Sequence, residues 1–195
     1  SMLFVCLPEA EIKTRNDTYL KVTDLPAKSS KKKIGIMWSS SFAPGLRGHR
    51  YAIDKQHYIS LIKETPHYEY YCLQSPMTEN DTMFCQQNGI NVVDHVDLYN
   101  DFNKSSSFLA SLDYVIGPSS LNTELAAACG TTFFHIANAK EVASMRNGDV
   151  DLISSHDQLS ENTVTIYPIQ NYGERSNYEI TKDCFDHLKL IIKKL

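Results

Sequence analysis

Residues 111–136 constrain the fold of this chain more than any other stretch. The stretch opens with a short apolar run that stops at a Gly-Pro pair, and a second apolar run occupies residues 131–136. Between the two runs, Leu121, Leu125 and Ala128 recur at helical spacing until a glycine ends the pattern. The stretch therefore predicts a strand, a helix and a second strand. Its 26 residues are enough for a parallel crossover, which is right-handed in nearly all proteins.

The same alternation continues through the rest of the chain. Further strands are predicted over residues 34–38, 68–74, 90–93 and 163–167, and further helices over 55–64, 78–88, 97–112 and 178–195. The predicted fold class is α/β, with a single Rossmann-like, mostly parallel sheet flanked by helices. Residues 1–32 contain a mixed polar stretch, a proline and a Lys/Ser run, so we interpret them as a leading segment or linker. Residues 33–195 are expected to form the folded domain.

Composition excludes several classes of function. A net charge of −4 without a long basic block argues against nucleic acid as the main partner. No apolar run approaches the roughly 20 residues that span a bilayer, so no membrane span is expected. The seven histidines show no spacing typical of metal ligands. The five cysteines are scattered without a C-x-x-C pair, which is typical of reduced core residues in a cytoplasmic protein.

Two polar loops are candidate binding sites, because each is predicted to leave the carboxyl end of a strand. Open α/β sheets bind their ligands at that edge. In the first loop, Ser119 and Ser120 lie at the predicted start of a helix, where unpaired N–H groups and the peptide dipoles attract an anion. Serines are also common helix caps, so a purely structural role stays open.

The second loop follows the first strand of the domain and is rich in small residues. Ser39, Ser40 and Ser41 would let a ligand approach the backbone, and Arg47 or Arg50 could form paired hydrogen bonds with a phosphate. The alternative is a flexible surface loop with two solvated arginines. The local sequence does not separate the two interpretations.

A family resemblance extends over residues 19–168. It is carried by the order and spacing of several loose motifs: Ile-Gly-Ile-Met-Trp-Ser-Ser-Ser from residue 34, Gly48-His49-Arg50, Cys72-Leu73-Gln74, Leu109 to Gly117, Ser119-Ser120, and Glu124 to Gly130. In these motifs the chain resembles the C-terminal, donor-binding domain of a GT-B glycosyltransferase. The closest group is often found behind tetratricopeptide repeats in bacteria and is related to the heptosyltransferases and the protein O-GlcNAc transferases.

The resemblance implies one half of a GT-B fold and a function. Such a domain binds a nucleotide sugar, and the enzyme transfers the sugar and releases a nucleoside diphosphate without a metal ion or cofactor; a UDP sugar is one candidate donor. The residues implied at the diphosphate are Ser39, Ser40, Ser41, Arg47, Arg50, Ser119, Ser120 and Thr123. Those implied at the ribose and base are Glu124, Gln74, His135 and Asn138. A carboxylate repels phosphate, so Glu124 is expected to accept hydrogen bonds from hydroxyls.

The chain departs from the family pattern at several of these positions. Relatives usually carry arginine where Ser39 stands, many carry Asp-Thr in place of Ser119 and Ser120, and many carry histidine or another polar group in place of Glu124. Fewer positive charges weaken the stabilisation of a departing diphosphate. A non-catalytic α/β binding or interaction module is therefore the alternative. A nicotinamide or flavin Rossmann domain is less favoured, because no G-x-G-x-x-G follows a strand.

The acceptor side of the reaction is a separate question. GT-B enzymes place the acceptor, and usually the general base, on an N-terminal domain, which residues 1–32 are too short to form. We therefore expect a separate acceptor-binding domain, a partner protein that supplies one, or a module that no longer transfers sugar. His49, His57 and His135 are the histidines expected near the ligand edge, and no catalytic base is assigned among them.

Overall fold

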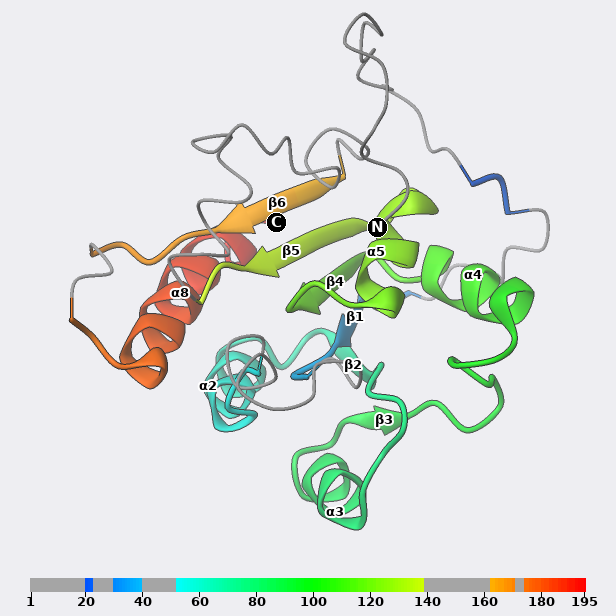
Figure 1. Ribbon diagram of the computed structural model, residues 1–195, viewed down its shortest axis with the longest axis horizontal. Helices are drawn as coiled ribbons and strands as arrows, with labels where there is room; N and C mark the ends of the chain where they lie inside the picture. Colours follow the sequence, from blue (N-terminus) through cyan, green and yellow to red (C-terminus); the bar gives the residue numbers. More distant parts are fainter. Residues whose placement is uncertain (1–19, 23–29, 40–51, 139–161, 171–173) are drawn as a thin grey trace, which may run out of the picture.

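The computed structural model describes residues 20–22, 30–39, 52–138, 162–170 and 174–195 of the chain (Figure 1). Within these ranges six strands form one sheet: β1 (Lys33–Ile36), β2 (Glu69–Cys72), β3 (Asn91–Val92), β4 (Tyr114–Gly117), β5 (Thr132–Ile136) and β6 (Thr163–Ile166). Five helices accompany the described strands: α2 (Gln56–Glu64), α3 (Glu79–Gln87), α4 (Phe102–Ala110), α5 (Leu121–Ala128) and α8 (Asn177–Ile192). The predicted alternation of strands and helices is confirmed.

All pairs of neighbouring strands are parallel, and the strand order is β3-β2-β1-β4-β5-β6. The predicted fold class is therefore confirmed as an α/β fold with a single Rossmann-like sheet. The chain builds outward from β1 to β3 and then returns to place β4 on the other side of β1. The carboxyl ends of β1 and β4 meet at this reversal of strand order, which is where open α/β sheets bind ligands.

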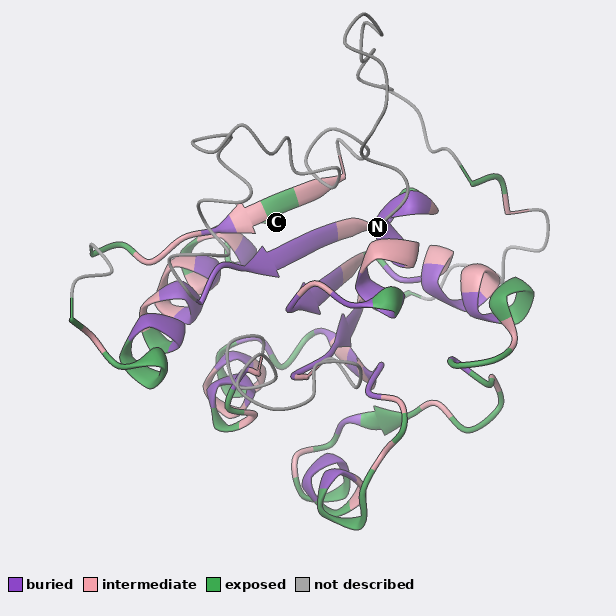
Figure 2. Ribbon diagram, viewed as in Figure 1, coloured by how far each residue is buried: buried purple, intermediate pink, exposed green. Residues whose placement is uncertain are grey.

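Apolar side chains cover both faces of the sheet, because successive strand residues point to opposite sides. In β4, Val115 belongs to the apolar cluster shared with α4 and α5, whereas Ile116 belongs to the cluster shared with α2 and α8. In β5, Phe133 belongs to the cluster shared with α4 and α5, and Phe134 belongs to the cluster shared with α2 and α8. Figure 2 shows the buried central strands and the exposed outer sides of the helices. Burial on both faces explains why these strands occur in the sequence as short, nearly continuous apolar runs.

The buried face of α5 combines polar residues with alanines. Leu121 is 50% exposed, whereas the polar residues Asn122 and Thr123 are buried together with Ala126 and Ala127. The two polar side chains form hydrogen bonds inward, with the end of β2 and with the turn before the helix. The alanines make the apolar contact with the sheet. Of the three apolar residues whose spacing predicts the helix, Ala128 is buried, Leu125 packs against the core and Leu121 is exposed.

Helix α4 is shorter than predicted. The Asp97 carboxylate accepts hydrogen bonds from the backbone N–H groups of Tyr99 and Asn100, each over 3.0 Å, and Asp101 caps the helix one turn later. Aspartate side chains that bind nearby backbone N–H groups favour turns over helix. The first turn of the predicted helix is therefore a loop.

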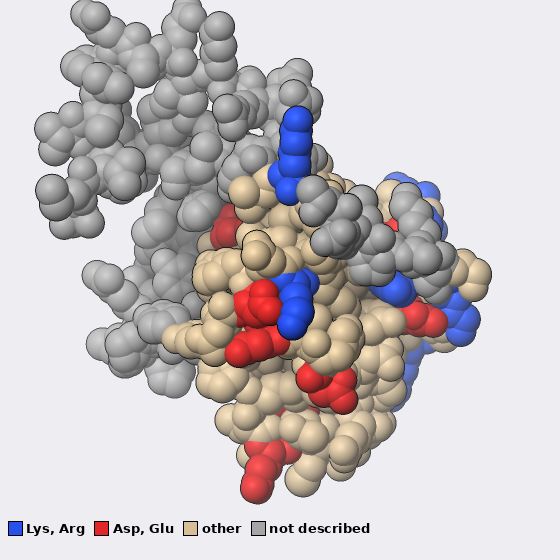
Figure 3. Space-filling model, turned by 90° about the vertical axis from the view of Figure 1, so that its right-hand side faces the viewer, with Lys and Arg blue, Asp and Glu red and all other residues tan. Residues whose placement is uncertain are grey.

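The described surface carries both signs of charge. Figure 3 shows Lys and Arg side chains interspersed with Asp and Glu on the side of the molecule where α4 lies. No helix in the described ranges is long and apolar enough to cross a membrane. Cys72, Cys85 and Cys184 are buried free thiols and Cys129 is a partly buried one, as predicted for reduced core residues.

His57 lies in the interface between α2 and α8. Its ring stacks on that of Phe185, with 5.5 Å between the ring centroids, and its centroid lies 4.6 Å from that of Tyr178. Only 6% of the residue is exposed, and Nε2 has no hydrogen-bond partner among the described residues. Burial lowers the pKa of His57, and the nearby Asp54 carboxylate opposes this shift only in part.

We predict that acid destabilises the protein through His57. Its pKa in the folded state lies below that of the unfolded chain, about 6.5, so the unfolded state binds the proton first as the pH falls. The contribution of His57 to the free energy of unfolding is therefore complete above this pH and decreases below it. Urea unfolding at pH 7.5 and 5.5 measures the change. His57→Phe keeps the ring stacking and should show a smaller change than the wild type.

The exposed His95 supplies the control for this experiment. His95→Phe should retain the pH dependence of the wild type. An equal pH dependence in the wild type and His57→Phe would contradict the role assigned to His57.

We also predict that Gly35, in the centre of the sheet, has no room for a side chain. A Cβ at this position would lie 2.6 Å from Leu73 Cδ1 and 2.8 Å from Leu112 Cδ1. Gly35→Ala should therefore lower the free energy of unfolding by about 1–3 kcal/mol, measured by chemical denaturation. The double variant Gly35→Ala/Leu112→Ala should lose less free energy of unfolding than the sum of the losses in the two single variants, because it removes the clashing Leu112 Cδ1. Additive costs would contradict the overpacking explanation.

Candidate functional site

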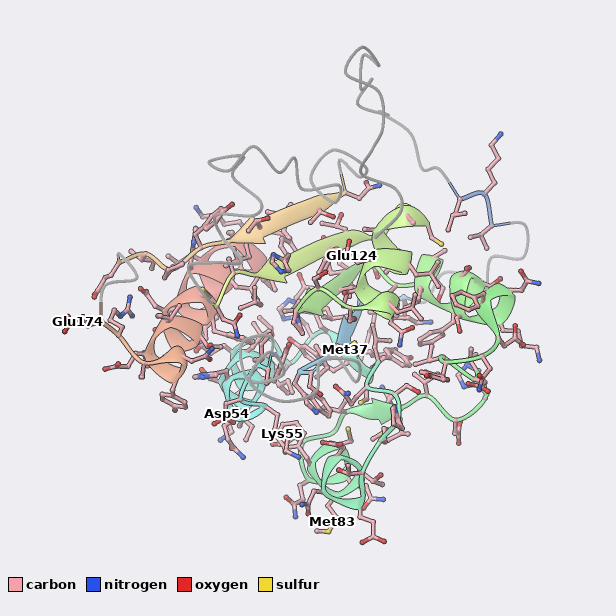
Figure 4. The ribbon with its side chains drawn as sticks, viewed as in Figure 1. Met37, Asp54, Lys55, Met83, Glu124 and Glu174 are labelled. Atoms are coloured by element: carbon pink, nitrogen blue, oxygen red, sulfur yellow. The ribbon has the colours of Figure 1, made fainter. Side chains whose placement is uncertain are left out.

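The carboxyl ends of β1 and β4 lie in contact where the strand order reverses. The backbone N–H of Met37, which follows β1, donates to the carbonyl oxygen of Ile116 over 3.0 Å. At Gly117, the last residue of β4, a Cβ would lie 2.7 Å from the Met37 carbonyl oxygen. A glycine is needed for this close approach, so the two segments stay together as they leave the sheet. Figure 4 labels Met37 beside β1 and Glu124 in α5 in this central region.

Ser120 and Thr123 form the cap of α5. The Ser120 hydroxyl accepts from the Thr123 N–H, and the Thr123 hydroxyl accepts from the Ser120 N–H over 2.9 Å. The Ser120 hydroxyl also donates to the sulfur of Met37 over 2.9 Å, and the Thr123 hydroxyl lies 2.9 Å from the Pro118 carbonyl oxygen. Both residues are buried, and the hydrogen bonds of both hydroxyls are explained by their contacts within the protein. A phosphate at this helix would meet the first backbone N–H groups, which have no acceptor within a helix.

Ser119 and Glu124 are bonded to each other at the same turn. The Ser119 hydroxyl donates to Glu124 Oε1 over 2.6 Å, a distance typical of a hydrogen bond to a carboxylate. The carboxylate lies in the first turn of α5, where the helix dipole stabilises negative charge. Both residues are half-buried, whereas Ser120 and Thr123 are buried. The Ser119–Glu124 pair is therefore the part of the predicted turn that remains accessible to a ligand.

Two buried amides hold the end of β2 to the neighbouring segments. Gln74 Oε1 accepts from the backbone N–H of Ser39 over 3.1 Å, which directs the chain as it leaves β1. Asn122 Nδ2 donates to the carbonyl oxygen of Leu73 over 3.1 Å. Sequence reasoning identifies Gln74 but misses Asn122, although its place in the first turn of α5 is a signal that could have identified it.

His135 and Asn138 reach the same edge from β5, and both are buried. Asn138 Nδ2 donates to the carbonyl oxygen of Ala52 over 3.0 Å and so anchors the segment that leads into α2. The ring of His135 lies 5.7 Å from that of Phe133, between centroids. The His135 ring therefore packs in the core, and Asn138 holds the segment before α2 in position. The remaining predicted positions lie outside the described residues: Ser40, Ser41, Arg47, His49 and Arg50.

A second polar cluster at this edge is not predicted from the sequence. The Asp81 carboxylate in α3 accepts from Trp38 Nε1 over 3.1 Å and pairs with Lys55 Nζ over 3.1 Å. Burial raises the pKa of Asp81, but the hydrogen bonds from Thr78 and the pairing with Lys55 outweigh burial, so the pKa lies below its usual value. Through Trp38 and Lys55, the ionised carboxylate holds the segment after β1 and the start of α2 against α3. Figure 4 labels Lys55 in this region.

Comparison with known proteins supports the fold. No protein-family model matches the chain, and no curated protein matches it. The solved structure of E. coli ADP-heptose LPS heptosyltransferase II is similar, with a TM-score of 0.56 and 15% sequence identity. The match covers 86% of this chain and 49% of the other, so the chain spans about half the length of that protein. The expected heptosyltransferase-like fold is therefore supported, and the relation to the tetratricopeptide-linked group stays a prediction.

We predict that Ser120 stabilises the fold without any ligand. Ser120→Ala removes the side-chain acceptor at the start of α5 and should lower the free energy of unfolding by about 1 kcal/mol. Ser120→Gly should cost only a few tenths of a kcal/mol, because glycine is tolerated at this position of a helix. Chemical denaturation measures both values, and Ser176→Ala at the equivalent cap of α8 is a matched comparison. Unchanged stability in Ser120→Ala would contradict a capping role.

Proposed function

We propose that this chain is the nucleotide-sugar (donor) binding domain of a metal-independent glycosyltransferase, which transfers a sugar and releases a nucleoside diphosphate. The observation that carries the proposal is the position of the accessible Ser119–Glu124 pair. It lies at the reversal of strand order, in a fold shared with half of a heptosyltransferase. Ligands of open α/β sheets bind at this point.

In this proposal, Glu124 accepts hydrogen bonds from the ribose hydroxyls of the donor. Its carboxylate already accepts one hydroxyl, that of Ser119, over a short distance. The same carboxylate would repel a phosphate placed against it. The proposed place of the diphosphate is therefore beside Ser119 and the first N–H groups of α5. Ser39 is a further proposed ligand, as are Arg47 and Arg50, which lie outside the described residues.

The proposed base site lies near the ends of β2 and β5. Gln74 and Asn138 are buried there and hold the backbone at Ser39 and Ala52. In this proposal they shape the base site through the segments that they position. Ser120 has the corresponding role at the diphosphate, because its hydroxyl holds the helix start in place.

The proposed chemistry requires two contributions from this domain. The domain holds the donor in one orientation, and it stabilises the negative charge that develops on the departing diphosphate. Backbone N–H groups at a helix start and arginine side chains can provide this stabilisation. The acceptor and the general base come from a separate acceptor-binding domain or a partner protein. The match to about half of a heptosyltransferase supports this division of roles.

A non-catalytic binding or interaction module is the second candidate. The observation in its favour is that the hydroxyls of Ser119, Ser120 and Thr123 all have partners inside the protein. A turn whose donors are satisfied can serve as a structural part of an α/β scaffold, and a shared fold does not imply a shared function. Nucleotide binding distinguishes the two candidates.

Calorimetric titration with UDP, GDP, ADP and CMP tests the proposal. We expect saturable binding of one of these nucleotides and a Kd at least about tenfold weaker in Glu124→Ala, because a hydrogen bond to a charged group contributes about 1.5–3 kcal/mol. Glu124→Ala also loses the hydrogen bond from Ser119, so its thermal midpoint should fall by a few degrees at most while the protein stays folded.

Glu69→Ala is the control for this titration, since Glu69 begins β2 and so lies at the opposite edge of the sheet. This variant should bind nucleotide like the wild type. Failure of the folded wild-type protein to bind any of the four nucleotides at millimolar concentration would refute donor binding and favour the non-catalytic module.

A further inference from the structure

We propose that Asp81 in α3 is a positioning residue for the proposed donor site. It acts through Trp38, whose side chain it binds by a hydrogen bond. Trp38 lies between Met37, whose sulfur accepts from the Ser120 hydroxyl in the cap of α5, and Ser39, a proposed ligand of the diphosphate. This inference rests on the proposed function and adds to it a residue outside the proposed ligand contacts. The affinity for a nucleotide should therefore depend on a buried carboxylate in another helix.

The short segment after β1 is held in place from several sides. Met37 is bonded through its backbone to β4 and to a tyrosine hydroxyl of α2. Ser39 donates its backbone N–H to Gln74 Oε1 over 3.1 Å. Between them, Trp38 makes the contact with α3, because its Nε1 donates to Asp81 Oδ1 over 3.1 Å. Each residue of the segment is therefore bound by a different part of the fold.

Both oxygens of the Asp81 carboxylate hold neighbouring segments. Oδ1 accepts from Trp38 Nε1 and from Lys55 Nζ, each over 3.1 Å. Oδ2 accepts from the backbone N–H of Thr78 over 3.0 Å and from its hydroxyl over 2.7 Å. Hydrogen bonds to an ionised group are among the stronger ones in proteins. The carboxylate therefore joins the segment after β1, the start of α2 and the cap of α3 at one point.

The two ends of the connection between β1 and α2 are held together at this point. The Ile53 N–H donates to the Trp38 carbonyl oxygen over 2.7 Å. Lys55 Nζ lies 5.9 Å from the centroid of the Trp38 ring, within the range in which a cation is attracted to an aromatic face. Figure 4 labels Met37 and Lys55, which belong to the two ends. Loss of the carboxylate between them would release both ends.

The proposed diphosphate site combines two segments whose relative position must be fixed. One is the start of α5, with its first backbone N–H groups, and the other is the backbone at Ser39. Hydrogen bonds weaken steeply when their atoms move out of range or alignment, and a preorganised site binds its ligand more tightly. The contact of Met37 with Ser120 joins the two segments, and Asp81 fixes the next residue along the chain.

Titration of Asp81→Ala with UDP, GDP, ADP and CMP tests the positioning role, and Asp183→Ala is the matched control. Each carboxylate has a side chain that is 12% exposed, and each pairs with a basic side chain and accepts a backbone N–H. Asp183, however, holds the segment after β6, the outermost strand. The nucleotide that the wild type binds should have a Kd roughly tenfold weaker in Asp81→Ala, the size expected when one hydrogen bond to a charged ligand is lost. Asp183→Ala should bind it like the wild type.

Trp38 provides a readout that a general loss of stability would not change. It is the only tryptophan of the chain, so the fluorescence of the folded protein reports on this contact. The emission should change in Asp81→Ala and stay the same in Asp183→Ala. Trp38→Phe removes the Nε1 donor, so it should also weaken nucleotide binding. If Asp81 acts through Trp38, the loss of affinity in the double variant should be smaller than the sum of the two single losses.

Several outcomes would overturn the positioning role and leave the proposed function standing. These are an unchanged or tighter Kd in Asp81→Ala, an equal loss of affinity in Asp183→Ala, and additive losses in the double variant. If Asp81→Ala does not fold, Trp38→Phe tests the same contact from its other side, and an unchanged Kd in that variant would overturn the role. A folded wild-type protein that binds none of the four nucleotides would overturn both the role and the proposed function.

Discussion

The pairing of β1 with β4 is the constraint on which the rest of the structure depends. β1 is the first strand of the sheet, yet it lies in the middle, with β2 on one side and β4 on the other. Two glycines make this arrangement possible. Gly35 lets Leu73 and Leu112 close over the sheet, and Gly117 lets the backbone of Met37 approach the end of β4. The segments that leave β1 and β4 are therefore held together at one edge, which is where the candidate site forms.

The first turn of α5 combines a structural and a proposed binding role by dividing its polar groups. Ser120 and Thr123 are buried and complete the cap, and Ser120 also contacts Met37, while Ser119 and Glu124 remain half-buried at the edge. Ser119 donates the hydrogen bond that Glu124 accepts within this turn.

Local patterns predicted most of the fold but only part of the candidate site. The strands and helices follow from apolar runs and from residues such as Ser120, which acts through its immediate neighbours. The contacts that sequence reasoning missed join positions far apart in the chain. Trp38 and Asp81 are 43 residues apart, and Asn122 and Leu73 are 49 residues apart. Apolar periodicity also gives no sign that the polar Asn122 and Thr123 of α5 are buried, because it takes no account of polar side chains that find partners inside the protein.

The sequence by itself determined the α/β class, the succession of strands and helices, and the polar turn at the start of α5. These features depend on interactions between residues close together in the chain, where spacing and residue type decide the outcome. Only the tertiary structure decided the strand order and which hydroxyls of the turn stay accessible. Both depend on contacts between distant segments, such as those of Met37 with Ile116 and Ser120, and the free energy of such contacts exists only once the chain has brought the partners together.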